Sequence, residues 1–90
     1  MPNIRLRGTF TCPPERLAAV RAALPDHVRL TRAEPGCLSF EVTETAAGTF
    51  VVAECFTDRD AFEAHQERTR ASHWATVTEG CARDYEVTEA

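Results

Sequence analysis

The sequence predicts an α+β fold with a four-stranded antiparallel sheet, in the ferredoxin-like order β-α-β-β-α-β. Two observations predict it. Apolar and polar residues alternate with the period of a strand in two stretches, and a third stretch is apolar on both sides. Segments with the apolar spacing of a helix follow the first and the third of these strands. The chain of 90 residues allows one domain, residues 1–90.

The first strand and the first helical segment occupy the N-terminal third of the chain. Residues 4–12 alternate between apolar and polar side chains, and two prolines end this strand. A helix is expected over residues 14–24, because leucine and valine recur there with helical spacing. Pro25 removes a backbone donor, so it predicts a kink or break, followed by a second helical piece over residues 26–33.

The middle of the chain predicts a hairpin. Residues 37–45 alternate as a strand, with three apolar side chains on one face: Leu38, Phe40 and Val42. A short turn at residues 46–48 leads into a strand over residues 49–56. Both faces of this second strand are apolar, which favours a central position covered on both sides.

The C-terminal third predicts the second helical segment and the last strand. A helix is expected through about residue 68, with a second piece over about residues 71–79. Gly80 is expected to end this helical piece, and residues 81–88 are expected to form the last strand.

Right-handed crossovers place both helical segments on one face of the sheet and leave the other face bare. Because the strand over residues 49–56 is apolar on both sides, the bare face predicts association. We therefore expect a homodimer through stacked sheet faces. A chain this short buries only about 60–65% of its surface alone. A partner would supply the missing stability and leave room for a pocket between sheet and helices in each monomer.

Composition excludes several classes of function. The net charge is −4, and the basic residues, all arginines, are scattered, which argues against nucleic-acid binding. No apolar run approaches the roughly 18–20 residues of a membrane span. Arg5 and Arg7 stand where a secretory signal needs its apolar core, so a cytoplasmic location is expected. The four cysteines lack CxxC spacing and the three histidines lack ligand spacing, which predicts reduced thiols and no metal site.

Three segments resemble the antibiotic biosynthesis monooxygenase superfamily, which includes quinol monooxygenases. Residues 32–42 resemble its Glu-Pro-Gly-Cys-x-x-Tyr/Phe segment. Residues 50–65 resemble a second signature, in which a strand ending in Glu-x-Trp precedes a helix with an inward histidine. Ser72-His73-Trp74 resembles a Ser-x-His-Phe segment. The resemblance covers about residues 4–88 and implies a dimeric α+β barrel.

The resemblance implies a monooxygenase that oxidises an aromatic quinol or polyketide-like molecule with O₂ and no cofactor. A non-catalytic ligand-binding or accessory dimer is the alternative, because three positions that are Asn, Trp and Tyr in the polyketide-oxidising members are Val52, Phe56 and Phe62 here. A haem-binding or haem-degrading protein is a weaker alternative. Asn3 and His73 match two of its three expected residues, but Phe56 replaces the tryptophan.

Candidate catalytic residues are His65, His73 and Glu54. His65 lies on an apolar helix stripe and is a candidate base, because imidazole titrates near neutrality. The alternative is a structural histidine bonded to a carbonyl or carboxylate. His73 is either a second polar contact or a solvated side chain.

Glu54 shares a strand face with apolar residues and is a candidate acid or base. The alternative is a structural ion pair with one of three arginines: Arg5, Arg7 or Arg83. Five aromatic residues are the candidate walls for a small aromatic or apolar ligand, or else pack in the core: Phe40, Phe56, Phe62, Trp74 and Tyr85.

Overall fold

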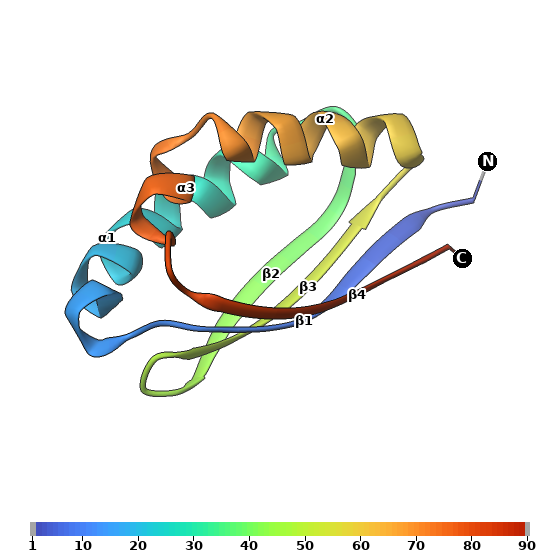
Figure 1. Ribbon diagram of the computed structural model, residues 1–90. Coiled ribbons are helices and arrows are strands. Elements are labelled where there is room, and N and C mark those ends of the chain that lie inside the picture. The colour runs from blue at the N-terminus through green and yellow to red at the C-terminus, as the bar shows by residue number, and fades with distance from the viewer. Residues whose placement is uncertain (1, 90) are drawn as a thin grey trace.

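The computed structural model describes residues 2–89. Its elements are β1 (Ile4–Thr11), α1 (Pro14–Arg32), β2 (Cys37–Ala46), β3 (Thr49–Phe56), α2 (Arg59–Arg70), α3 (His73–Val77) and β4 (Ala82–Glu89). The predicted ferredoxin-like order is confirmed, with α2 and α3 as the two pieces of the second helical segment (Figure 1).

The four strands form one antiparallel sheet in the order β2-β3-β1-β4. The predicted central position of β3 is confirmed, since β1 and β2 flank it. The helices lie on one face of this sheet and leave the other face uncovered (Figure 1). Gly48 closes the β2–β3 hairpin with a φ of 82°, a conformation that glycine adopts without strain.

Of the kink or break expected at Pro25, the break and the separate second piece are wrong, because α1 runs as one helix from Pro14 to Arg32. A proline inside a helix leaves the carbonyl four residues earlier without its donor. Here both Pro25 and Arg21 are exposed, so water can reach this carbonyl. The inner face of α1 continues past the proline, since Val20 and His27 are both buried.

The expected orientation of Leu38 was also wrong. The pairing of β2 with β3 shifts register between Cys37 and Ser39, so Leu38 is an extra residue in the strand. Such a bulge reverses the alternation of faces. Phe40 therefore points to the helices and is 2% exposed, whereas Leu38 is 55% exposed.

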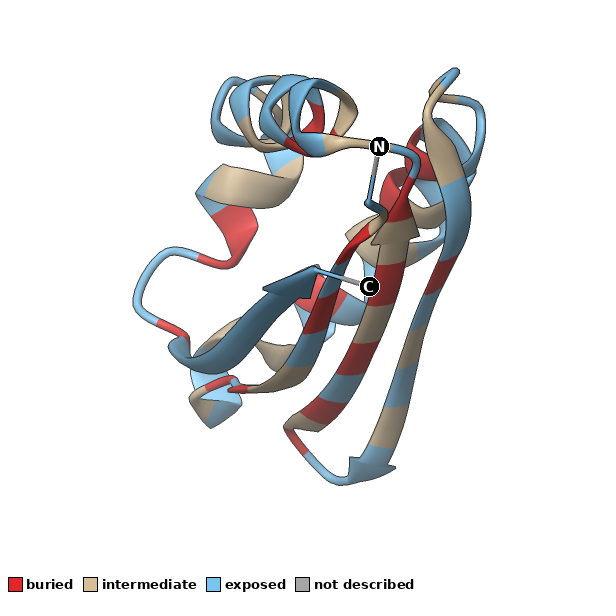
Figure 2. Ribbon diagram, turned by 90° about the vertical axis from the view of Figure 1, so that its right-hand side faces the viewer, coloured by how far each residue is buried: buried red, intermediate tan, exposed pale blue. Residues whose placement is uncertain are grey.

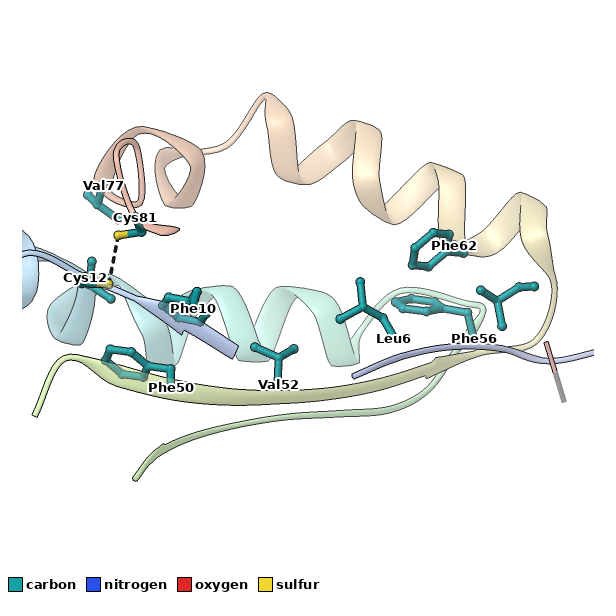
Figure 3. Packing of buried hydrophobic residues seen from close by; sticks show 11 residues of the cluster. Leu6, Phe10, Cys12, Phe50, Val52, Phe56, Phe62, Val77 and Cys81 are labelled. Atoms are coloured by element: carbon teal, nitrogen blue, oxygen red, sulfur yellow. Dashed lines mark hydrogen bonds between the residues drawn. The ribbon is translucent and has the colours of Figure 1, made fainter. Parts of the chain in front are cut away.

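The hydrophobic core lies between the helices and the inner face of the sheet (Figure 3). Phe10 and Phe50 stack at 4.7 Å between ring centroids, and Phe56 packs against Phe62. At the edge of this core the buried thiols of Cys12 and Cys81 lie 3.0 Å apart, joining the end of β1 to the start of β4. All four cysteines carry free thiols.

Exposure differs sharply between strands. Along β3 every second residue is buried, whereas every residue of β4 is exposed (Figure 2). The outer face of β3 carries Val51, Ala53 and Cys55, and no helix covers it. Among residues 2–89, no helix has the length and apolar character needed to cross a membrane.

Candidate functional site

A cavity of about 320 Å³ lies between the sheet and the helices. Every strand and helix contributes to its lining. Its apolar wall consists of Leu6, Phe10, Phe40, Val42, Val52, Trp74 and Ala75. Its polar lining consists of His27, Glu54, His65, Gln66, Thr69, Arg70, Thr78, Arg83 and Tyr85. The volume is at the small end of the range of about 300–1,000 Å³ for ligand sites.

A carboxylate orients His65 on α2. Its Nδ1 lies 2.7 Å from Oε1 of Glu34, a residue of the turn between α1 and β2. Because a carboxylate only accepts hydrogen bonds, Nδ1 carries the hydrogen and Nε2 keeps a free lone pair. Arg68 holds the same carboxylate, with its Nε 3.3 Å from Glu34 Oε2. The carboxylate partner expected of a structural histidine is therefore present, and the same contact leaves Nε2 available as a base.

Gly36 explains how Glu34 reaches His65. A Cβ atom at position 36 would lie 2.2 Å from the Cβ of Ala61, so only glycine allows this close approach to the start of α2. The carbonyl of Gly36 also accepts a hydrogen bond of 2.9 Å from the N–H of Thr57. His65 stands one helical turn after Ala61, which places it beside Glu34.

Glu54 on β3 faces the cavity with an oxygen that has no hydrogen-bond partner among residues 2–89. The residue is 7% exposed, and its Oε1 is the unpartnered atom. His65 Nε2 lies 3.8 Å from this same oxygen. Burying a carboxyl oxygen without a hydrogen-bond partner costs free energy. A hydroxyl group on a ligand in the cavity would supply that partner.

The expected ion pair between Glu54 and an arginine is absent from the described residues. Arg5 and Arg7 lie opposite Cys55 and Ala53, so they share the outer face of the sheet. Arg83 does line the cavity, but its guanidinium donates to the hydroxyl of Thr78 at 3.1 Å.

Burial sets the protonation of these groups. It raises the pKa of Glu54 to about 7, and the nearby charge of Glu34 acts in the same direction. It lowers the pKa of His65, against the opposing effect of the hydrogen bond to Glu34. It lowers the pKa of His27 to about 3, with the charges of His65 and Arg68 adding to the effect. At neutral pH both imidazoles are therefore neutral, and Glu54 exchanges a proton readily.

Aromatic rings pack against the two buried histidines of the site, His27 and His65. Trp74 stacks on His27 at 4.7 Å with 5° between the planes, and Phe40 meets His27 edge-on. Phe56 stacks on His65 at 4.9 Å but is fully buried behind it.

The structure therefore brings five of the predicted site residues together on one cavity: Phe40, Glu54, His65, Trp74 and Tyr85. It leaves Phe56 and Phe62 in the core beside the cavity. His73 is exposed and lines a separate depression with Asp26. Asn3 lies at another depression, so the residues expected for haem do not converge.

Two residues of the site escaped prediction. His27 continues the buried stripe of α1 defined by Val20 and Thr31, but that stripe becomes visible only once the helix is known to pass Pro25. Glu34 stands in the Glu-Pro-Gly segment, where its identity was the only signal.

Sequence comparison settles the family. The profile described as "Antibiotic biosynthesis monooxygenase" matches residues 3–77. The chain belongs to this family. A comparison with proteins of curated function finds no match.

Several solved structures share the fold of this antibiotic biosynthesis monooxygenase domain. Rv0793 from Mycobacterium tuberculosis is 29% identical with a TM-score of 0.70, over 98% of this chain and 92% of that one. A "putative antibiotic biosynthesis monooxygenase" from Deinococcus radiodurans is 23% identical with a TM-score of 0.75, over 97% and 91%. A Bacteroides thetaiotaomicron protein described as a "possible oxidoreductase" is 18% identical with a TM-score of 0.76, over 99% and 98%.

Proposed function

We propose that the protein is a monooxygenase that oxidises a small aromatic quinol with O₂, without a bound cofactor and with His65 as the base. The observation that carries this proposal is the Glu34–His65 pair, whose free Nε2 lies at an aromatic-walled cavity beside the unpartnered oxygen of Glu54. Membership of the monooxygenase family supports the reaction class.

The proposed reaction begins with proton transfer. A quinol or anthrone in the cavity gives a proton to Nε2 of His65, which leaves an electron-rich anion. A carbon atom of this anion donates two electrons to O₂, which forms a C–O bond and reduces O₂ to a bound peroxide. The peroxide takes back the proton from Nε2 of His65 and becomes a hydroperoxide. Loss of water from the hydroperoxide then leaves a carbonyl. One oxygen atom enters the product and the other enters water.

Glu54 supplies the acid in this scheme. The neutral carboxyl donates a hydrogen bond to the substrate oxygen and gives a proton to the departing hydroxide. A pKa of about 7 suits this exchange, because the best acid-base groups titrate near the working pH. His65 lies within 3.8 Å and can return the proton.

The size of the cavity favours a ligand of two or three fused rings over an extended polyketide. Its volume of about 320 Å³ holds little more than such a ring system. Trp74 and Phe40 both line the cavity and both contact His27, so their rings are the candidates for stacking on an aromatic ligand.

We also propose that the protein acts as a homodimer through the outer sheet face. Within residues 2–89 no helix covers the stripe of Val51, Ala53 and Cys55 (Figure 1), and Arg7 and Glu41 flank Ala53 on either side. A two-fold axis parallel to β3 would place Arg7 of one copy over Glu41 of the other, so the charges at the rim would be complementary.

Oxygen uptake tests the proposed activity. Protein dialysed against a chelator is mixed with anthrone or 1,4-dihydroxynaphthalene, and the rate above autoxidation is followed with an oxygen electrode. The His65→Gln variant should lose roughly 10²- to 10⁴-fold in rate, because it removes the base. His73→Gln is the matched control and should keep the rate.

A rate equal to autoxidation, or a His65→Gln variant as fast as the wild type, contradicts the proposal. Tight ligand binding without oxygen uptake would instead support the second candidate, a non-catalytic binding protein. The apolar Val52 in the cavity wall, at a position where polyketide-oxidising members of the family carry a polar residue, favours that candidate.

A further inference from the structure

We propose that the same cavity recognises an oxyanion on its aromatic ligand, a carboxylate or a phosphate, through Arg83 with Arg70 at the rim. The inference rests on the proposed function, because it assumes an aromatic ligand in this cavity. It narrows the substrate class from aromatic quinols to hydroxylated aromatic acids or aryl phosphates.

Arg83 is held in place at the cavity wall. It lies on β4 opposite Phe10 of β1, and its Nη2 donates to Oγ1 of Thr78 at 3.1 Å. Thr78 is 2% exposed, and its hydroxyl donates in turn to the carbonyl of Trp74 at 2.7 Å. The guanidinium is therefore tied through Thr78 to the helix that carries the stacking residue Trp74.

Neither arginine at the cavity has a carboxylate partner among the residues that the structure describes. Among the ten arginines, four form such pairs: Arg21, Arg29, Arg59 and Arg68. Within residues 2–89, four more lie outside this cavity without a pair: Arg5, Arg7, Arg16 and Arg32. Arg70 and Arg83 instead line the cavity without one. In a chain with 14 acidic and 10 basic residues, two unneutralised arginines at one cavity indicate a site for an external anion.

The carboxyl of Glu54 and the guanidinium of Arg83 line the cavity at two separated places. Glu54 lies opposite Leu6 of β1, whereas Arg83 lies opposite Phe10, four residues further along that strand. Four residues of an extended strand span about 13 Å. Val52, which lies opposite Gly8 of β1, forms apolar wall at the level between these two places.

A ligand that matches this pattern has a hydroxyl at one end, a flat apolar middle and an oxyanion at the other end. The hydroxyl meets His65 and Glu54, and the ring lies against Trp74. The oxyanion meets Arg83, whose guanidinium binds carboxylate or phosphate with two parallel hydrogen bonds. The hydroxyl of Tyr85, which faces the same cavity, can add a further donor.

Calorimetric titration under nitrogen tests the proposal without turnover. The ligands are 2,6-dihydroxynaphthalene, 6-hydroxy-2-naphthoate and 6-hydroxy-2-naphthyl phosphate, which share one hydroxyl and differ only in the group at the opposite end of the ring system. The wild type should bind at least one anionic ligand roughly 10- to 100-fold more tightly than the neutral diol, since a charged hydrogen-bonded pair is gained. Tighter binding of the carboxylate identifies an aromatic acid, and tighter binding of the phosphate identifies an aryl phosphate.

The variants locate the effect. Arg83→Gln should remove most of the preference for the anion while the affinity for the neutral diol is kept, and Arg83→Lys should restore part of it. Arg29→Gln, which removes the same charge from an exposed position on α1, should change neither affinity. Circular dichroism confirms that each variant is folded.

Equal affinities for the anionic and neutral ligands would overturn the proposal, as would an Arg83→Gln variant that weakens both equally. The proposed function is tested by a separate measurement, oxygen uptake. A protein that prefers anions but takes up no oxygen would refute the monooxygenase and keep the anion site.

Discussion

Two titratable side chains, Glu54 and His65, lie side by side on the cavity, and the carboxylate of Glu34 contacts His65. Glu34 accepts hydrogen bonds from both Arg68 and His65, so it fixes the orientation of the imidazole. His65 is buried and has a lowered pKa, so it stays neutral and basic. Glu54 has no cationic partner, so burial raises its pKa to about 7. In the proposed reaction Glu34 orients His65, His65 accepts a proton, and Glu54 donates one.

The raised pKa of Glu54 predicts a loss of stability with rising pH. Its ordinary value is 4.5 and its folded value about 7, so between these limits the folded state binds more protons than the unfolded state. The free energy of unfolding should therefore fall from about pH 4.5 to about pH 7, by about 3 kcal/mol for this group. Glu54→Gln should remove this fall. Denaturant midpoints on both sides of the interval measure it.

Glu63→Gln is the control for this comparison, because Glu63 is exposed on α2 and changes the charge by the same amount. If the wild type and Glu54→Gln keep a constant difference in unfolding free energy across the interval, Glu54 does not titrate with a raised pKa.

At the scale of the single residue, sequence reasoning found part of the site. Glu54 and His65 were predicted because a polar side chain on an apolar strand or helix face is visible in the spacing alone. The role of Glu34 was not, since its contact with His65 depends on a turn packing against α2. Local spacing carries no information about that contact.

Elements were predicted best where local rules and packing agree. All four strands were found. Two of them, β1 and β2, alternate between apolar and polar residues, and β3 is apolar on both faces as its central place requires. The break at Pro25 and the face of Leu38 failed for opposite reasons. In α1 the packing of Val20 and His27 overrides a local helix breaker. In β2 a single extra residue, set by pairing with β3, reverses a face that simple alternation assigned.

The junction between the α1–β2 turn and α2 should depend on Gly36. Gly36→Ala places a methyl group 2.2 Å from the Cβ of Ala61, so the turn must move away from α2. We expect a loss of about 1–3 kcal/mol in unfolding free energy. The displaced Glu34 should also lower the oxygen-uptake rate. Urea denaturation and oxygen uptake measure the two effects.

The double variant Gly36→Ala/Ala61→Gly tests whether this clash is the cause, because it removes the Cβ of Ala61 that the new methyl group would strike. It should recover part of the activity, although glycine inside α2 costs about 1 kcal/mol of its own. If the double variant loses as much unfolding free energy as the two single variants together, the clash is not the reason for the loss.

At the scale of the whole molecule, the uncovered sheet face is the main difference between this chain and a complete barrel. The helices cover one face only, and β4 is exposed along its whole length. With a stacked partner the outer stripe of β3 would gain the cover that the short chain cannot supply. The cavity lies on the opposite face of the sheet, so association would stabilise the cavity wall without filling it.

The proposed dimer should therefore dissociate when a charge enters the outer face. Val51→Glu puts a carboxylate into the stripe, where both copies would bury it. Leu30→Glu is the matched control, because Leu30 on α1 is 43% exposed and Val51 is 40% exposed, yet Leu30 lies away from the sheet. Sedimentation should show a dimer for the wild type and Leu30→Glu, and a monomer for Val51→Glu.

Because association stabilises the folded state by mass action, the melting temperature of the wild type should fall on dilution, while that of Val51→Glu should not change. A wild-type monomer whose melting temperature is independent of concentration would refute the dimer and leave the apolar stripe of β3 as ordinary exposed surface.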